Sequence, residues 1–160
     1  MVVGSGPMLA ELEALAARLG VAATCRFEPA TSQVAERLRG FDIFVLPSLS
    51  EALSNSLMEA MACGCCAVAS DVGGNPELVR HGETGLLFRA GDAAELAARL
   101  GLALRDGQLR RKLAESGARF IRESFSVETA VRRMEAIYLR LWRERRGSPP
   151  TTAGEKVAVH

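Results

Sequence analysis

The sequence predicts an α/β protein in which helices cover both faces of a parallel sheet. Short apolar runs, such as residues 41–46 and 66–70, alternate with amphipathic stretches in the order β-α-β-α-β over the first half of the chain. This alternation favours a parallel sheet because each strand reaches the next through a covering helix. The last third has leucines at helical spacing and no strand-like run, so we expect the chain to end in long helices.

The first 46 residues are expected to supply three strands and two helices. The strands are short apolar runs at residues 2–3, 23–27 and 41–46. Pro7 suits the first turn of the first helix because its φ is already helical. The apolar face of this helix is expected at four residues with helical spacing, Met8, Leu12, Leu15 and Leu19. Thr31 or Ser32 is expected to cap the second helix.

The middle of the chain is expected to add a fourth and a fifth strand, at residues 66–70 and 84–88. The loop after the third strand leads into a helix that either Ser54 or Ser56 can cap with its hydroxyl oxygen. Pro76 is expected to start a further short helix between the fourth and fifth strands.

Three helices are predicted after residue 90, with Asp92 capping the first and Ser126 capping the last. Their core-facing positions are expected to be Leu96, Leu100 and Leu104 in the first, Leu109, Leu113 and Phe120 in the second, and Val127, Val131, Met134, Tyr138 and Leu141 in the third. Residues 1–146 form one predicted domain. Residues 147–160, rich in Gly, Ser, Pro and Thr, form a predicted disordered tail.

The charges are divided unevenly along the chain. The net charge is only +1, but residues 1–98 carry six arginines and twelve acidic residues, whereas residues 99–146 carry thirteen basic and six acidic ones. The basic C-terminal helix is expected either to contact acidic lipids or to be a solvated face. No apolar run approaches the roughly 20 residues of a membrane span. Nucleic acid is not an expected partner, because the sequence shows no aromatic platform and no recognised module.

The four cysteines, Cys25, Cys63, Cys65 and Cys66, show no disulfide framework. Three of them lie among small apolar residues, so we expect buried reduced thiols, as is typical of a cytoplasmic protein. A zinc site is disfavoured because Cys63-x-Cys65-Cys66 is not a knuckle spacing and no second pair completes four ligands. The expected location is the cytoplasm, at the inner face of the membrane if the basic helix binds lipid.

The stretch 47–77 has the features of a ligand-binding region. Two glutamates, Glu51 and Glu59, are separated by seven residues, and small polar residues lie between them. The stretch follows a predicted buried strand and leads into a helix. Such a junction is where α/β proteins bind anions and polar ligands.

This stretch resembles the nucleotide-sugar-binding half of the retaining glycosyltransferases of family four, which have the GT-B fold. The resemblance rests on Glu-x7-Glu, the segment Ala-Met-Ala-Cys-Gly at 60–64, a short strand, and Gly-Gly-Asn-Pro-Glu at 73–77. Three further segments match, at 3–7, 42–48 and 82–87. The resemblance covers residues 1–142 and implies a Rossmann-like donor-binding domain, which is one half of a GT-B fold.

In the resembled family the first glutamate contacts the donor sugar, so Glu51 is the expected carboxylate of the catalytic site. Its two oxygens match two neighbouring sugar hydroxyls. The residues alone also allow a solvated loop carboxylate, and they do not decide whether Glu51 acts as a nucleophile.

The resemblance places Glu59 on the ribose hydroxyls of the nucleotide. The residues alone allow a second role, because Ser56-x-x-Glu59 is a capping box in which Glu59 would accept the backbone N–H of Ser56. The two roles need the same carboxylate oxygens, so they exclude one another.

The backbone N–H groups of Ala52, Leu53, Ser54 and Asn55 are expected to bind the diphosphate at the start of the helix. The family has Glu-Gly-Phe-Gly where this chain has Glu51-Ala52-Leu53-Ser54, so two glycines are replaced. Binding would weaken if Ala52 or Ser54 had to adopt a positive φ.

Four glycines complete the expected donor site. Gly73 and Gly74 either allow close approach of a ligand or serve only as a tight turn. Gly4 and Gly6 are expected to edge the nucleotide pocket. His81 is expected to be a solvated loop residue. No metal ion or other cofactor is expected, and the nucleotide-diphosphate sugar is the expected substrate.

The resemblance implies a two-domain retaining glycosyltransferase, of which this chain matches only the second domain. The N-terminal acceptor domain is expected to be missing, together with the first strand of the second domain and the Arg and Lys that clamp the diphosphate in the family. The isolated chain is therefore expected to turn over little, because a leaving diphosphate needs cationic stabilisation. Two alternatives stay open. One is a non-catalytic nucleotide-sugar-binding module or truncated gene product. The other is a sugar-nucleotide epimerase, against which Glu-x7-Glu argues.

Overall fold

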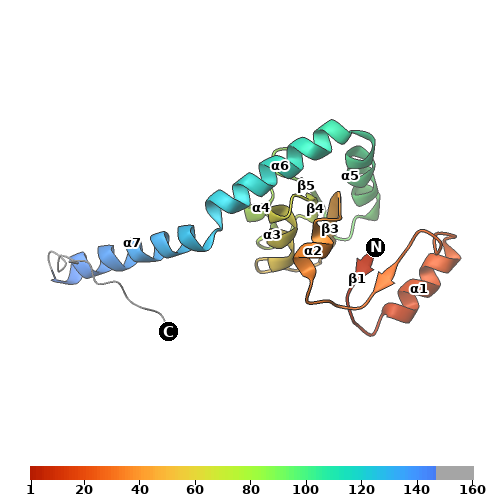
Figure 1. Cartoon of the computed structure of the whole chain (residues 1–160), viewed down its shortest axis with the longest axis horizontal. Helices are drawn as coiled ribbons and strands as arrows, with labels where there is room; N and C mark the ends of the chain where they lie inside the picture. The colour runs from red at the N-terminus through yellow and green to blue at the C-terminus, as the bar shows by residue number, and fades with distance from the viewer. Residues whose placement is uncertain (147–160) are drawn as a thin grey trace.

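The computed structural model describes residues 1–146, in which seven helices and five strands form (Figure 1). The strands are β1 (Val2–Val3), β2 (Phe27–Glu28), β3 (Ile43–Leu46), β4 (Cys66–Ser70) and β5 (Leu86–Phe88). The helices are α1 (Leu9–Arg18), α2 (Val34–Leu38), α3 (Asn55–Ala62), α4 (Asn75–Leu78), α5 (Ala93–Arg105), α6 (Gly107–Ser124) and α7 (Val127–Arg146). The predicted disordered tail lies outside the described residues.

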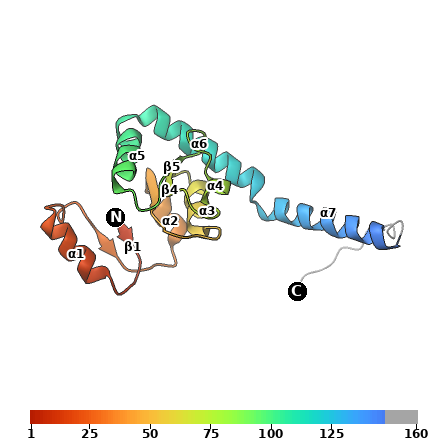
Figure 2. The same ribbon diagram turned by 180° about the vertical axis from the view of Figure 1, so that it is seen from behind.

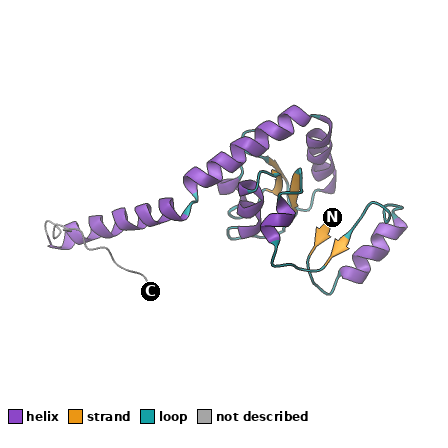
Figure 3. Ribbon diagram, viewed as in Figure 1, coloured by secondary structure: helices purple, strands orange, loops and turns teal. Residues whose placement is uncertain are grey.

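The strand pairs are all parallel, as predicted, but the strands form two sheets instead of one (Figure 3). β1 pairs with β2, and β4 lies between β3 and β5 in the second sheet. Within residues 1–146 no strand pairs with the second edge of β1 or of β3. β1 and β2 have two residues each, and both β1 valines are exposed, so little apolar burial holds this pair against the second sheet.

β4 is the centre of the core because each of its side chains is buried. Successive side chains of a strand point to opposite faces. On one face, Ala67 and Ala69 belong to a cluster that also contains Leu57 of α3, Leu78 of α4 and Ile121 near the end of α6. On the other face, Val68 belongs to a cluster that also contains Ala103 of α5 and Leu113 of α6. The predicted arrangement of helices on both faces is thus confirmed for the second sheet.

The apolar face predicted for α1 exists but is not buried in the described part of the chain. Met8 and Leu19 are 55% and 66% exposed, and in α1 only Ala16 is buried. In α5 the prediction fails at one position, because Leu104 is 67% exposed while Leu96 and Leu100 pack against the core. Helical spacing shows which side of a helix is apolar, but not whether another element covers that side.

The predicted helix caps are confirmed at three helices. The Ser54 hydroxyl accepts the Leu57 N–H, Asp92 accepts the Glu95 N–H, and Ser126 accepts the Thr129 N–H. At α2 the prediction is wrong. The helix begins after Gln33 without a side-chain cap, and the Thr31 hydroxyl accepts the Gln33 N–H just ahead of it.

Three predicted strands are shorter or displaced in the structure. The strand expected at 41–46 begins only at Ile43. The strand expected at 23–27 is reduced to Phe27–Glu28, because residues 21–25 instead form a turn in which the N–H groups of Thr24 and Cys25 both donate to Val21 O. The strand expected at 84–88 begins at Leu86, after a single bridge between His81 and Gly85.

α7 projects away from both sheets in the two opposite views (Figures 1 and 2). Its predicted apolar stripe is exposed along its length, at Val127, Val131, Met134, Tyr138 and Leu141. Among the described helices none is long and apolar enough to cross a membrane.

Candidate functional site

The loop between β3 and α3 folds back against the turn that follows β4. A Cβ placed on Gly73 would lie 1.6 Å from the backbone oxygen of Glu51, and one on Gly74 would lie 2.1 Å from that of Ala52. These distances are far shorter than any real carbon–oxygen contact, so only glycine fits at either position. Gly73 also has a φ of +51°, which favours glycine independently. The carboxyl ends of β3 and β4 therefore meet through direct backbone packing.

Glu51 lies in this loop with a half-buried side chain. Its Oε1 accepts a hydrogen bond of 2.7 Å from the Ser48 hydroxyl. This bond orients the carboxylate, and the contact of Glu51 with a donor sugar stays a prediction. Ser48 was not among the expected site residues. Two signals in the sequence pointed to it: its place directly after the Pro that ends a buried strand, and its place at the end of the matching segment 42–48.

Two buried polar residues, Ser70 at the end of β4 and Asn75 in α4, connect to the same loop through hydrogen bonds. The Ser70 hydroxyl donates to the Ser48 backbone oxygen at 2.6 Å, and Asn75 Nδ2 donates to the Ser70 backbone oxygen at 3.0 Å. Both side chains are completely buried. Asn75 Oδ1 is the one buried side-chain N or O atom among the described residues without a hydrogen-bond partner.

The start of α3 presents free backbone donors beside this loop. The Ser54 side chain accepts the N–H of Leu57, which leaves the N–H groups of Asn55 and Ser56 without a partner among the described contacts. The first turn of a helix attracts anions through such groups and through the helix dipole. No non-glycine residue in the described chain has a positive φ, so Ala52 and Ser54 replace the family's glycines without backbone strain.

Glu59 lies one turn further along α3, on the exposed face that also carries Asn55. The capping-box alternative is wrong, because the cap of α3 is Ser54 and not Ser56, so Glu59 is not at the third helical position. The carboxylate of Glu59 makes no hydrogen bond or ion pair with the described residues. Its carboxylate is therefore available to a ligand.

Gly4 and Gly6 lie elsewhere in the described structure. They line a hollow of about 310 Å³ together with apolar residues of β1, β2 and α1, including Val2, Leu9 and Phe27. None of the residues that line this hollow belongs to the Glu51 loop or to α3. The structure thus brings Glu51, Ala52, Leu53, Gly73 and Gly74 together next to Ser54 and Asn55, but does not join Gly4 and Gly6 to them.

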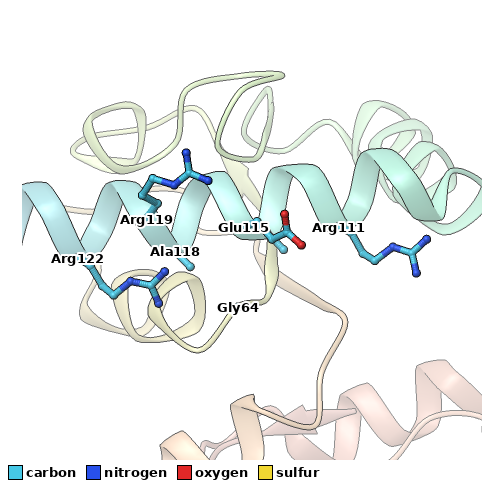
Figure 4. Close-up of a pocket in the computed structure, with 7 residues that line it drawn as sticks. Gly64, Arg111, Glu115, Ala118, Arg119 and Arg122 are labelled. Carbon is cyan, nitrogen blue, oxygen red and sulfur yellow. The ribbon is translucent and has the colours of Figure 1, made fainter.

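A hollow of about 520 Å³ runs along α6 beside Gly64 (Figure 4). Three exposed arginines, Arg111, Arg119 and Arg122, line it together with Glu115. None of these arginines forms an ion pair with the described residues. Because no lining residue follows a strand, this hollow is separate from the site at the strand ends.

His81 has a structural contact that the sequence did not reveal. Its side chain is exposed, as expected, but its Nδ1 accepts the backbone N–H of Leu87 at 2.9 Å. This bond fastens the loop before β5 to the strand. His81 therefore anchors this loop, and it forms no hydrogen bond with Glu51 or Glu59.

The four cysteines are free, and Cys65 and Cys66 are buried as predicted, whereas the prediction of burial fails at Cys63, which is only partly buried. Burial raises the pKa of the Cys65 thiol from 9.0 to about 11, with smaller contributions from Cys63, Cys66 and Asp42. Burial also raises the pKa of Cys66 to about 11, although Arg110 opposes the shift. No group of three His, Cys, Asp or Glu side chains in residues 1–146 could hold a metal ion.

We predict that the free energy of unfolding falls as the pH rises from 9 towards 11. Unfolded thiols ionise near 9.0, whereas the folded thiols of Cys65 and Cys66 keep their protons until about 11. The unfolded state therefore loses protons first and is favoured in this range. Denaturant unfolding at several pH values gives the free energy of unfolding as a function of pH. This free energy should fall less steeply with pH in the double variant Cys65→Ala/Cys66→Ala than in the wild type. Equal slopes for both proteins would contradict this interpretation.

The fold and the site define an α/β protein with a group of polar residues at the carboxyl ends of the parallel strands β3 and β4. This edge of the sheet is the usual ligand position in the class. The chain belongs to the glycosyl transferases group 1 family, whose model matches residues 1–120.

Curated relatives are longer than this chain. It is 33% identical over 144 residues to the N-acetyl-alpha-D-glucosaminyl L-malate synthase of Bacillus anthracis, an alignment that covers 90% of this chain and 38% of that protein. It is 40% identical over 130 residues to the D-inositol 3-phosphate glycosyltransferase of Geodermatophilus obscurus, covering 80% of this chain and 28% of that protein. The chain thus spans well under half the length of these relatives.

Solved structures of similar fold also come from longer chains. Anabaena HepE in complex with UDP matches with a TM-score of 0.80 and 26% identity, covering 85% of this chain and 39% of that one. The sucrose-phosphate synthase from Thermosynechococcus elongatus matches with a TM-score of 0.77 and 30% identity, covering 89% and 38%. These neighbours are GT-B glycosyltransferases, so the predicted fold class is confirmed.

Proposed function

We propose that this chain is the donor-binding part of a retaining glycosyltransferase and that it holds a nucleotide-diphosphate sugar at the junction of β3, β4 and α3. The observation that carries the proposal is the pair of glutamates on either side of a helix start with free N–H groups. The Glu51 carboxylate is oriented by Ser48, and the Glu59 carboxylate has no partner among residues 1–146. UDP bound to HepE, a structural neighbour, supports a nucleotide ligand.

The diphosphate is placed at the start of α3. The N–H groups of Asn55 and Ser56 can donate to phosphate oxygens, and the helix dipole adds a favourable positive potential. Ala52 and Leu53 precede the helix and extend this row of backbone groups. Gly73 and Gly74 contribute indirectly, because they let the β4–α4 turn hold the loop of Glu51 in place.

The two carboxylates then serve the two ends of the ligand. Glu59, one helical turn after Asn55, accepts hydrogen bonds from two ribose hydroxyls. Glu51 accepts hydrogen bonds from the donor sugar through the oxygen that Ser48 does not occupy. Its negative charge also lies where positive charge develops at the anomeric carbon during transfer.

Cationic groups are scarce at this site. No Arg or Lys side chain forms a hydrogen bond or ion pair with the described residues of the 47–54 loop. A diphosphate leaving group needs positive charge to depart. We propose that other parts of the whole protein supply this charge and the acceptor site, and that residues 1–160 alone bind the donor with little turnover.

Calorimetric titration of the chain with UDP, GDP and ADP tests this function. We expect one nucleotide to bind and Glu59→Ala to weaken its binding about 10- to 100-fold, since a hydrogen bond to a charged group contributes about 1.5–3 kcal/mol.

Glu115→Ala is the matched control, because Glu115 is an exposed helical glutamate that lines the arginine hollow. It should leave binding unchanged. If Glu115→Ala strengthened binding while Glu59→Ala had no effect, the nucleotide would lie in the arginine hollow and the proposal would be wrong.

We further propose peripheral contact with anionic lipid through α6 and α7. The three arginines of the α6 hollow, which form no ion pair within residues 1–146, and the exposed apolar stripe of α7 suit a surface that is both anionic and apolar. Changing Arg111, Arg119 or Arg122 to Gln should weaken binding to phosphatidylserine vesicles about fivefold each, at about 1 kcal/mol per charge. Arg18→Gln in α1 is the control. The proposal would be contradicted if the affinity for these vesicles changed neither with salt concentration nor with the three arginine substitutions.

A further inference from the structure

A chain of three hydrogen bonds runs from α4 to the Glu51 carboxylate. Asn75 Nδ2 donates to Ser70 O at 3.0 Å, Ser70 Oγ donates to Ser48 O at 2.6 Å, and Ser48 Oγ donates to Glu51 Oε1 at 2.7 Å. The first two bonds are made by fully buried side chains. The chain joins the carboxyl ends of β3 and β4 to the carboxylate that the proposed function places on the sugar.

Ser70 is the one polar side chain in β4, where Cys66, Ala67, Val68 and Ala69 are small and apolar. A buried hydroxyl costs stability unless it is hydrogen-bonded, so alanine would serve the core at least as well. The hydroxyl makes its bond to the neighbouring loop and not to its own strand. Its effect is to hold the Ser48 backbone at a fixed distance from the end of β4.

Ser48 turns this fixed backbone into a fixed carboxylate. Its hydroxyl occupies Glu51 Oε1, whereas Oε2 makes no hydrogen bond with the described residues. The Glu51 backbone is held separately, because Gly73 packs against its carbonyl. With both backbone and Oε1 restrained, the free oxygen Oε2 keeps one direction, and a side chain with several rotatable bonds needs no further ordering when a ligand binds.

We propose that Ser48 and Ser70 are positioning residues, which hold the Glu51 carboxylate in one orientation and thereby set the preference of the site for a sugar-bearing nucleotide over the bare diphosphate. This inference rests on the proposed function for its ligand, but the orientation of Glu51 is a property of the chain alone. The two parts can therefore be tested separately.

The first test measures the χ1 rotamers of Glu51 by three-bond couplings in isotope-labelled chain without ligand. Thr and Val have the same shape, but only Thr keeps the hydroxyl. Wild type and Ser48→Thr should show one dominant rotamer, whereas Ser48→Val and Ser70→Ala should show averaged couplings. Thermal unfolding checks that each variant is folded. If Ser70→Ala does not fold, the comparison of Ser48→Thr with Ser48→Val still decides the question. The same single rotamer in all folded variants would overturn the proposal.

The second test compares UDP-glucose with UDP in calorimetric titrations. Wild type and Ser48→Thr should prefer UDP-glucose, and Ser48→Val and Ser70→Ala should lose this preference while their UDP affinity stays the same. A preference that persists in Ser48→Val overturns the positioning role. Failure of wild type to bind either ligand overturns the proposed function, and the rotamer comparison still decides whether Ser48 and Ser70 position Glu51.

Discussion

Gly73→Ala is expected to destabilise the chain by about 3 kcal/mol or more, in the upper part of the range for single substitutions. The new Cβ would lie 1.6 Å from the Glu51 backbone oxygen, so either the Glu51 loop or the β4–α4 turn must move. The positive φ of +51° adds about 1–2 kcal/mol for any residue with a Cβ. Donor binding should be lost together with stability, because the displaced loop carries Glu51 and leads into α3. Denaturant unfolding measures the first effect and titration with nucleotide the second.

Gly91→Ala separates the two causes. Gly91 also has a positive φ, +78°, but a Cβ there would have no neighbour within 4 Å. Its substitution should cost only the backbone strain, about 1 kcal/mol, and leave binding intact. Equal losses of stability in the two variants would mean that the packing of Gly73 against Glu51 contributes nothing.

Asn75→Asp is expected to cost about 3 kcal/mol or more at pH 7, since it places a carboxylate in a fully buried site. The new oxygen would also face the Ser70 carbonyl, which Asn75 Nδ2 now bonds at 3.0 Å. Burial would raise the pKa of the new carboxyl above its unfolded value of about 3.9. The folded state would therefore hold its proton longer. The loss should be smallest below about pH 4 and grow as the pH rises through the folded pKa.

Asn55→Asp is the control for this change, because Asn55 is exposed at the first position of α3. The same substitution there should alter the free energy of unfolding by less than about 1 kcal/mol, and in the stabilising direction, because a negative charge suits a helix N-terminus. Thermal or denaturant unfolding of both variants from pH 3 to 8 gives the comparison. A pH-independent loss in Asn75→Asp would argue against a buried carboxylate.

Local patterns predicted much of the second sheet. The strand at 66–70 was recognisable as an unbroken apolar run, and β4 has the same bounds with every side chain buried. Asp92 and Ser126 were recognisable as caps because each precedes an amphipathic stretch, and the cap of α3 was narrowed to Ser54 or Ser56, of which the structure shows Ser54. These features depend on residues that are close in sequence, which explains why sequence alone was sufficient.

The remaining features depend on contacts between distant residues. The strands divide into two sheets because β1 and β3 do not pair with each other. The apolar face of α1 is exposed because no other described element covers it. The spacing of apolar residues along the sequence indicates neither feature. Gly73 and Gly74 read equally well as a turn or as a place for a ligand, whereas the structure shows them against the loop of Glu51 and Ala52. The link from Ser70 to Ser48 joins two strand ends and was not predicted either.

The capping box shows why a motif needs its structural context. Ser56-x-x-Glu59 matches the pattern, but α3 starts two residues earlier than that pattern requires, after Ser54. This shift of two residues in the cap moves Glu59 from a helix-capping position to the exposed face of the second turn. The role proposed for Glu59 depends on this difference.

The measurement that tests the central claim most directly is the backbone amide NMR spectrum of the labelled chain during titration with UDP. The account predicts that the signals of Asn55, Ser56 and Glu59 shift and saturate together, because the diphosphate and ribose contact them directly. Shifts confined to Arg111, Arg119 and their neighbours on α6, or no shift at ligand concentrations on the order of several millimolar, would contradict a donor site at the start of α3.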